Sequence, residues 1–208
     1  MSDLLTLFGE MSATVSPDNN RGTGAGGAKT NANGKRFEDK TDNSPRLLSI
    51  RYEKNKIEEK NKSKFNYYLN RSDDEKSITF VNQSGFKFYV KSRYNIDTFR
   101  YPDESYIIEY ASGRNVIKIL EKKEQNVNGS AETKLWSSPS LKREYELVFG
   151  ENFEIQYCLC VNKFLQNLLT SDGEKYVILN KILEESGVKV FFGEEESYFE
   201  HLDFWINN

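Results

Sequence analysis

The amino-acid sequence predicts an α/β fold in which helices flank a mixed central β-sheet. Two observations lead to this prediction. Strand-like apolar runs alternate with helical patterns along most of the chain, and its 208 residues are enough to bury one core. The 14 Phe and 12 Tyr residues supply apolar surface for that core. We expect a short helix and a flexible Gly/Asn-rich arm over residues 1–33, followed by a single domain over residues 34–208.

The first third of the chain is mostly polar. Residues 1–12 have the pattern of a short amphipathic helix, whereas residues 13–34 consist mainly of Gly, Asn, Ser and Thr and are typical of a loop or a disordered arm. A helical turn is expected from Gly34 to Thr41, because Pro45 disfavours helix in the residue before it. The basic segment Arg46–Lys64 is expected to be helical at its start.

Four segments in the middle of the chain have the β-branched and aromatic content of strands, and we expect them to pair as two hairpins. They are residues 77–81 with 86–90, and residues 105–110 with 116–124. The pair Ser84-Gly85 is expected to form the first turn and residues 111–115 the second.

The last third alternates between helices and strands. Helices are expected at residues 130–136, 141–149, 163–169, 174–185 and 197–206, and strands at residues 153–161 and 188–192. The first two helices are separated because Ser138-Pro139 has the pattern of an N-cap followed by the first helical position. Three aromatic side chains of this region are expected in the core rather than stacked against bases: Trp136, Tyr145 and Phe149.

Charge is unevenly distributed along the chain. The formal net charge of −3 argues mildly against nucleic-acid binding. However, residues 21–64 carry 12 basic and 6 acidic groups, whereas residues 171–208 carry 3 basic and 9 acidic groups. This asymmetry allows one surface to face phosphates while the whole chain stays acidic. A solvated, charged helix explains the Lys54–Lys64 run nearly as well, so the charge pattern supports DNA binding without establishing it.

Residue types exclude several classes of function. Cys158 and Cys160 point to the same face of a strand and are poorly placed to bond to each other, so we expect buried free thiols. No Cys/His cluster completes a zinc site, and the single histidine, His201, has no Ser or Cys partner in a recognisable motif for a catalytic triad. No apolar run approaches the roughly 20 residues that cross a bilayer, and the first residues lack the pattern of a secretory signal. We therefore expect no membrane partner and a cytoplasmic location.

The residues with the most specific chemistry lie at the open end of the second hairpin. Asp103 belongs to its first strand, and Glu121 and Lys123 belong to its second. If the turn is centred near Gly113, antiparallel pairing places Asp103 opposite Lys123 and Ser105 opposite Glu121. On this register the three charged side chains gather on one face, and a one-residue slip would separate them.

The second strand of this hairpin changes character without changing face. Its odd positions run from Ile117 and Ile119 through Glu121 and Lys123 to Gln125. The strand therefore leaves an apolar core and enters a polar cleft. Two carboxylates placed in this way can hold a hard divalent cation such as Mg²⁺, and an ammonium group beside them can hold a water molecule or stabilise charge that develops on a phosphate. A salt-bridged hairpin edge is the structural alternative for the same residues.

Five stretches of the chain are similar to motifs of one enzyme family. They are Gly26–Asn31, Gly34–Glu38, Pro102–Glu104, Glu121–Gln125 and Asn128–Leu135. On these residues the chain resembles the PD-(D/E)XK nucleases, in particular small Type II restriction endonucleases of bacteria and large DNA viruses. The resemblance extends over residues 22–170 and is strongest between residues 101 and 150.

The resemblance implies a restriction-endonuclease-like core and a role for individual residues. Asp103 and Glu121 would bind Mg²⁺ as the cofactor, Lys123 would assist the attacking water, and Glu38 on the first helix would lie near the metal. Glu104 would take the place of Asp103 if the register slipped. Four further residues are candidates for contact with DNA: Lys29, Lys35, Arg36 and Gln125.

We therefore expect a Mg²⁺-dependent Type II restriction endonuclease that hydrolyses phosphodiester bonds of double-stranded DNA at a short specific sequence. A repair, recombination or structure-selective nuclease would use the same residues. A DNA-binding protein with an inactive nuclease-like fold is the alternative from another class, but it has no need for all three charged groups. A palindromic target would favour a homodimer with two-fold symmetry, and the resemblance alone implies a partner DNA methyltransferase.

Overall fold

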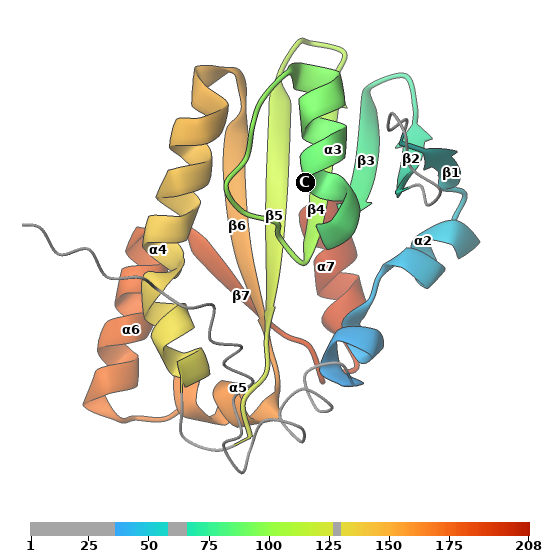
Figure 1. The fold of residues 1–208 in the computed structure, drawn as a ribbon. Coiled ribbons are helices and arrows are strands. Elements are labelled where there is room, and N and C mark those ends of the chain that lie inside the picture. The colour runs from blue at the N-terminus through green and yellow to red at the C-terminus, as the bar shows by residue number, and fades with distance from the viewer. Residues whose placement is uncertain (1–35, 58–65, 127–129) are drawn as a thin grey trace, which may run out of the picture.

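The computed structural model describes residues 36–57, 66–126 and 130–208 (Figure 1). A seven-stranded sheet runs through this part of the molecule, and its strands are arranged in the order in which they occur in the chain. They are β1 (Glu53–Lys56), β2 (Tyr67–Ser72), β3 (Lys76–Asn82), β4 (Glu104–Tyr110), β5 (Asn115–Lys123), β6 (Glu154–Val161) and β7 (Val188–Phe192). Neighbours from β1 to β5 are antiparallel, whereas β5, β6 and β7 are parallel to one another. The sheet is therefore mixed and the fold is of the α/β class, as predicted.

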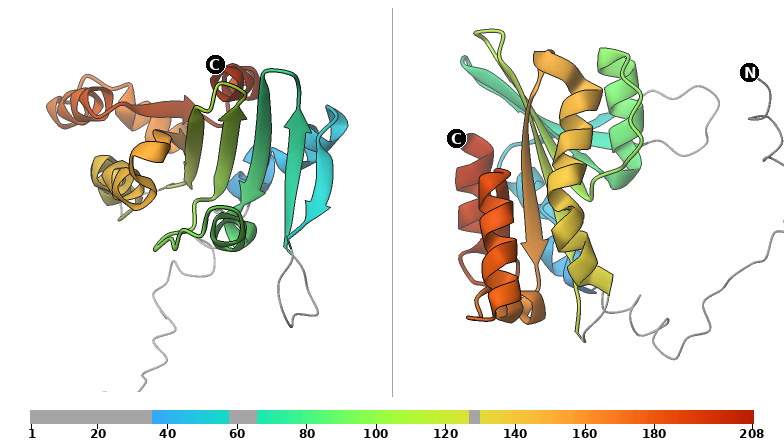
Figure 2. Two further views of the ribbon diagram at one scale, coloured as in Figure 1. Left: turned by 90° about the horizontal axis from the view of Figure 1, so that it is seen from above. Right: turned by 90° about the vertical axis from the view of Figure 1, so that its left-hand side faces the viewer.

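Helices cover both faces of the sheet (Figure 2). The first face is covered by α3 (Gln83–Tyr94) and α4 (Ser130–Phe149), and the second face by α7 (Tyr198–Asn207), α2 (Ser44–Ser49) and the helical residues 36–41. A short helical turn, η1 (Gly150–Asn152), leads from α4 into β6, and α5 (Lys163–Leu169) and α6 (Glu174–Glu185) connect β6 to β7. Parallel neighbours need such crossovers, because a tight turn cannot join them.

Each face of the sheet has its own apolar core, and β5 contributes to both. Ile117 and Ile119 belong to the core on the first face, whereas Val116 and Leu120 belong to the core on the second face. This division follows from the alternation of side chains along a strand. The hydrogen-bond or ion-pair partner of a polar side chain on β5 must therefore lie on the same face of the sheet as that side chain.

The predicted strand at residues 86–90 is wrong, and so is the hairpin turn at Ser84-Gly85, because this segment belongs to α3. Three of its buried side chains have the spacing of one helix face: Phe86, Tyr89 and Val90. The side chain of Asn82 accepts a hydrogen bond from the backbone N–H of Gly85 and caps the helix. Helical spacing and the N-cap outweigh the alternating pattern that predicts a strand here.

The prediction of two helices separated at Ser138-Pro139 is also wrong, because α4 is continuous and contains Pro139. Proline lacks a backbone N–H, so the carbonyl of Leu135 loses its helical partner. The hydroxyl of Ser138 donates a hydrogen bond to this carbonyl at 2.5 Å and replaces the missing donor. The expected N-cap residue therefore stabilises the interior of one long helix.

The sequence does not predict β1 and β2. Helix α2 confirms the expected helical start of the segment Arg46–Lys64, but the residues that follow it form a charged strand at the edge of the sheet. Charged side chains, Lys above all, are common on edge strands, where they discourage pairing with other molecules. The helix and arm expected over residues 1–33 lie outside the described residues.

Other expectations concern single residues. Cys158 and Cys160 are free and buried in the core of the second face, as predicted. Three aromatic side chains of α4 lie in or against the core of the first face, also as predicted: Trp136, Tyr145 and Phe149. Over the part of the chain that the structure describes, no helix combines the length and the apolar character that crossing a bilayer requires.

Lys118 is a charged residue of β5 that points into the second face. It is buried, and its Nζ donates a hydrogen bond to the carbonyl of Trp205 and lies 5.6 Å from the centroid of the Trp205 ring. That carbonyl belongs to the last turn of α7, where carbonyls lack helical partners. Burial lowers the pKa of Lys118 to about 8, and the positive charges of Lys189 and Lys76 act in the same direction.

The buried Lys118 predicts a pH dependence of stability. Its pKa is lower in the folded chain than in the unfolded chain, so the free energy of unfolding should rise as pH increases from about 8 to about 10.5. Lys118→Met should remove this contribution, which is at most about 3 kcal/mol. Urea unfolding of both proteins across this pH range measures the difference. A difference that stays constant with pH would contradict the prediction.

Candidate active site

The β4–β5 hairpin carries the predicted site, but its register differs from the prediction by two residues. Ser105 lies opposite Ile119 instead of Glu121. The difference arises at the turn, which is centred one residue earlier than expected, since Glu109 pairs with Asn115. A shift of two residues keeps every side chain on its predicted face.

Asp103, Glu121 and Lys123 lie together at the end of this hairpin. The Nζ of Lys123 is 2.7 Å from Oε2 of Glu121 and 3.8 Å from Oδ2 of Asp103. The same Oδ2 accepts a hydrogen bond from the backbone N–H of Lys122 at 2.7 Å, which holds the Asp103 carboxylate against β5. Two mostly buried carboxylates, one directly before β4 and one on β5, thus converge on one ammonium group.

The surroundings of Glu121 disfavour its negative charge. Burial raises the pKa of Glu121, the positive charge of Lys123 opposes this shift, and the negative charge of Asp103 adds to it. The two carboxylates repel each other, so the fold must hold them together. A cationic group placed between them relieves the repulsion.

The opposite face of the same hairpin carries a second acid–lysine pair. Oε1 of Glu104 is 2.7 Å from Nζ of Lys122, and the two side chains are only 3% and 5% exposed. Glu104 also accepts hydrogen bonds from the backbone N–H of Asn43 and from the hydroxyl of Tyr106. Glu104 therefore does not take the place of Asp103, because strand alternation puts the two carboxylates on different faces.

Glu38 approaches Asp103 from the helical residues 36–41. Glu38, Asp103 and Glu104 line one cavity of about 300 Å³. Partial burial and the charge of Asp103 raise the pKa of Glu38. The structure thus brings Glu38 near Asp103, as the resemblance implies, but Glu121 does not line this cavity and Glu38 reaches the site from a different side.

Gln125, a candidate for contact with DNA, is buried and bonded within the fold. Its Oε1 accepts a hydrogen bond from the backbone N–H of Glu132 at the start of α4. Sequence reasoning missed Asn162, whose side chain bonds to both the backbone N–H and the backbone C=O of Gln125. Asn162 also caps α5 through the N–H of Leu165. An Asn directly before a helix is the sequence signal that identifies such a residue.

The remaining candidates for contact with DNA are only partly within the described residues. Arg36 is exposed at the start of the helical residues 36–41, whereas Lys29 and Lys35 lie outside them. Sequence reasoning also missed Lys134 on α4 as a charge at the site. Lys134 is exposed, forms no ion pair among the described residues, and acts on the carboxylate of Glu121. Only the packing of α4 over the first face brings it there.

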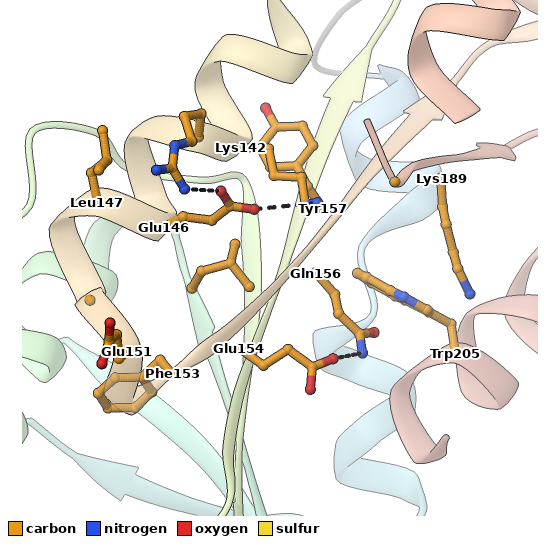
Figure 3. A pocket seen from close by; sticks show the side chains of 14 residues that line it. Lys142, Glu146, Leu147, Glu151, Phe153, Glu154, Gln156, Tyr157, Lys189 and Trp205 are labelled. Carbon is orange, nitrogen blue, oxygen red and sulfur yellow. Dashed lines mark hydrogen bonds and ion pairs between the residues drawn. The ribbon is translucent and has the colours of Figure 1, made fainter. Parts of the chain in front are cut away.

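A larger cavity, of about 780 Å³, lies at the other end of β6 (Figure 3). It is bordered by the end of α4, the start of β6 and Trp205. One of its acidic residues, Glu146, is already paired with Lys142 and Arg143. No predicted site residue borders this cavity, so its size alone does not make it a reaction centre.

Comparison with known proteins gives no match to any protein-family model, curated protein or solved structure. The chemistry of the chain must therefore be inferred from two sources. One is the geometry around Asp103, Glu121 and Lys123, and the other is the motif resemblance described above.

Gly193, directly after β7, allows the helical residues 36–41 to approach the sheet. A Cβ atom at this position would lie 2.6 Å from Sγ of Cys160 and 2.8 Å from side-chain atoms of Phe37 and Thr41. Gly193→Ala should therefore displace the segment that carries Glu38 and lower the free energy of unfolding by about 1 to 3 kcal/mol. Urea unfolding and hydrogen exchange of residues 36–41 measure the two effects.

Gly173→Ala is the matched control. Its added Cβ would lie 3.4 Å from the side chain of Tyr176, which is an ordinary contact. This variant should lose less stability and leave the exchange of residues 36–41 unchanged. Equal effects of the two substitutions would show that Gly193 has no special role in placing Glu38.

Proposed function

We propose that the chain is a metal-dependent DNA nuclease, more specifically a Type II restriction endonuclease that hydrolyses phosphodiester bonds of double-stranded DNA at a short specific sequence. The observation that carries the proposal is the convergence of Asp103 and Glu121 on Nζ of Lys123. Carboxylates that bind a cation, with an ammonium group beside them, are suited to hydrolysis of a phosphodiester.

The residues present fit a hard divalent cation such as Mg²⁺. Both carboxylates have an oxygen within 3.8 Å of one positively charged nitrogen, so these oxygens face a common position. Among the described residues no group of three or more His, Cys, Asp or Glu side chains gathers as a metal site. Water and substrate oxygens would therefore complete the shell, which is usual for Mg²⁺. When bound, Mg²⁺ supplies Lewis acidity at this position.

Each residue of the site has a separate role in this proposal. Asp103 and Glu121 hold the cation, and the backbone N–H of Lys122 orients Asp103. The ammonium group of Lys123, beside both carboxylates, holds the attacking water or stabilises negative charge that develops on the phosphate. Glu38 adds negative charge to the Asp103 side of the site.

The restriction-enzyme assignment depends on the motif resemblance more than on the geometry. A repair, recombination or structure-selective nuclease would use the same groups, and an inactive DNA-binding relative would not need them. Incubation of unmethylated plasmid DNA with Mg²⁺ distinguishes the three by discrete fragments, a smear or structure preference, or no cleavage. If the chain is a restriction enzyme, we also expect a homodimer with two-fold symmetry and a partner DNA methyltransferase. Comparing cleavage of methylated and unmethylated DNA tests for the methyltransferase partner.

Removal of single charges at the site should separate cleavage from DNA binding. Glu121→Gln and Asp103→Asn keep the size of each side chain but remove the charge that attracts the cation, and Lys123→Ala removes the ammonium group. Each variant should lose nearly all Mg²⁺-dependent cleavage, because each effect contributes several kcal/mol to such a transition state. DNA binding should survive, and the carboxylate variants should bind at least as tightly as the natural protein without metal. Gel assays of cleavage and binding measure both.

Glu154→Gln is the control for a lost carboxylate, since Glu154 is exposed and pairs with Arg114 at the other end of the sheet. It should cleave like the natural protein. Near-normal cleavage by Glu121→Gln would show that the active site is elsewhere.

The affinity for DNA should fall steeply as salt increases, because phosphate contacts release counterions. Lys134 acts on Glu121, and Arg36 begins the helical residues that carry Glu38; both cations are exposed. Arg36→Gln and Lys134→Gln should each reduce the slope of log affinity against log salt by about 1. Lys189→Gln, at the distant cavity, should leave the slope unchanged. Fluorescence anisotropy in the cleavage-deficient Glu121→Gln background measures the slopes. Unchanged slopes for both variants would show that DNA binds to another surface. Charge-neutralising substitutions at Lys29 and Lys35 test these two predicted DNA contacts in the same way.

A further inference from the structure

Two enclosed tyrosine hydroxyls on the first face lack hydrogen-bond partners. Tyr157 on β6 and Tyr145 on α4 are only 1% and 2% exposed, and their ring centroids are 6.3 Å apart. Neither hydroxyl oxygen has a partner among the described residues. An enclosed hydroxyl that gives up its hydrogen bonds to water costs free energy. Because buried polar groups are normally hydrogen-bonded, we expect each of these two hydroxyls to bond to a protein group or to an enclosed water molecule.

The strand register places Tyr157 beside Glu121. Tyr157 pairs with Ile119, and Leu159 pairs with Glu121, so Tyr157 is the diagonal neighbour of Glu121 on the adjacent strand. Ile119 and Tyr157 both belong to the core of the first face, which is the face to which Glu121 points. Neighbouring strands are about 4.8 Å apart and rise about 3.3 Å per residue, so a diagonal neighbour on the same face is about 8 Å away and within reach of an aromatic side chain.

Tyr145 reaches the same place from α4, which covers the first face. Burial raises the pKa of both tyrosines, and Glu121 is the charge that adds most to this shift in each case. The two hydroxyls therefore lie within the electrostatic range of the Glu121 carboxylate.

Glu121 has an unused acceptor. Its Oε2 accepts a hydrogen bond from Lys123, whereas Oε1 has no hydrogen bond among the described residues. One carboxylate oxygen on β5 without a hydrogen bond among the described residues thus lies on the same face as two phenol donors without partners. Hydrogen bonds from neutral donors to a carboxylate are about twice as strong as those between neutral groups.

We propose that Tyr145 and Tyr157 are positioning residues that donate hydrogen bonds to Glu121, through one enclosed water molecule, when a divalent cation binds, and so hold its carboxylate in the orientation that ligates the cation together with Asp103. This inference rests on the proposed function of the site. It assigns the two tyrosines no contact with DNA and no proton transfer.

The experiment measures Mn²⁺ binding to the full chain by electron paramagnetic resonance, without DNA and without a cleavage assay. Tyr157→Phe and Tyr145→Phe remove one donor each and keep the ring. Each should weaken Mn²⁺ binding about tenfold, the loss expected for one hydrogen bond to a charged group. The line shape of the bound Mn²⁺ signal should also change, because the orientation of one ligand changes. Thermal unfolding without added metal should be unchanged or shifted upward, because these hydroxyls form no hydrogen bond among the described residues and the proposed bond forms only with the cation.

Tyr94→Phe is the matched control. The hydroxyl of Tyr94 is also enclosed, but the carboxylate that acts on it is Glu109, which pairs with Arg93 and is not a residue of the candidate site. This variant should bind Mn²⁺ like the natural protein.

The outcomes separate this inference from the proposed function. If Mn²⁺ binds and Glu121→Gln abolishes binding, but both tyrosine variants bind normally, the tyrosines do not position Glu121 and the nuclease proposal stands. If loss of affinity accompanies loss of thermal stability, or occurs equally in Tyr94→Phe, the role is one of packing and the inference is overturned. If binding does not depend on Asp103 and Glu121, the proposed function fails, and this inference fails with it.

Discussion

The buried ion pair between Lys122 and Glu104 holds the end of the β4–β5 hairpin, and the geometry of the candidate site depends on it. Both charges are removed from water, but Glu104 also receives hydrogen bonds from Asn43 and Tyr106. Loss of one partner of such a pair typically costs about 3 to 5 kcal/mol. A one-residue slip of β5 would turn Lys122 away from Glu104 and drive Glu121 toward the core of the second face. The ion pair therefore opposes the slip that would dismantle the site.

The same pair anchors the segment that carries Glu38. The backbone N–H of Asn43, just after the helical residues 36–41, donates to Glu104 at 3.1 Å, and Nζ of Lys122 lies 3.5 Å from the carbonyl of Glu38. Close packing at Gly193 brings this segment against the sheet. The position of Glu38 is therefore determined by contacts on the second face, although its carboxylate affects Asp103.

The first face has the opposite character at this end of the sheet. Two carboxylates are crowded together, Glu121 is largely out of water, and the hydroxyls of Tyr145 and Tyr157 are unpaired. Each of these features costs stability, and together they concentrate where cation binding is proposed. The buried ion pair of Glu104 and Lys122 on the second face supports them, because a binding group is held in place by the rigid elements behind it.

The sequence by itself determined which residues of β5 share a face, because side-chain alternation is a local property of a strand. It did not determine the register, since the turn before β5 is centred one residue from the predicted position. The three site residues still share one face because the register error is two residues, and an even shift does not change the face of a side chain. Residues 86–90 fit both a strand and a helix, and burial of one helix face against the sheet decided between them. The surroundings of Glu121 were decided by tertiary structure alone. The side chains that act on Glu121 come from α4 (Lys134 and Tyr145) and from β6 (Tyr157). No local sequence pattern shows which side chains a crossover helix and a parallel strand bring to the end of β5.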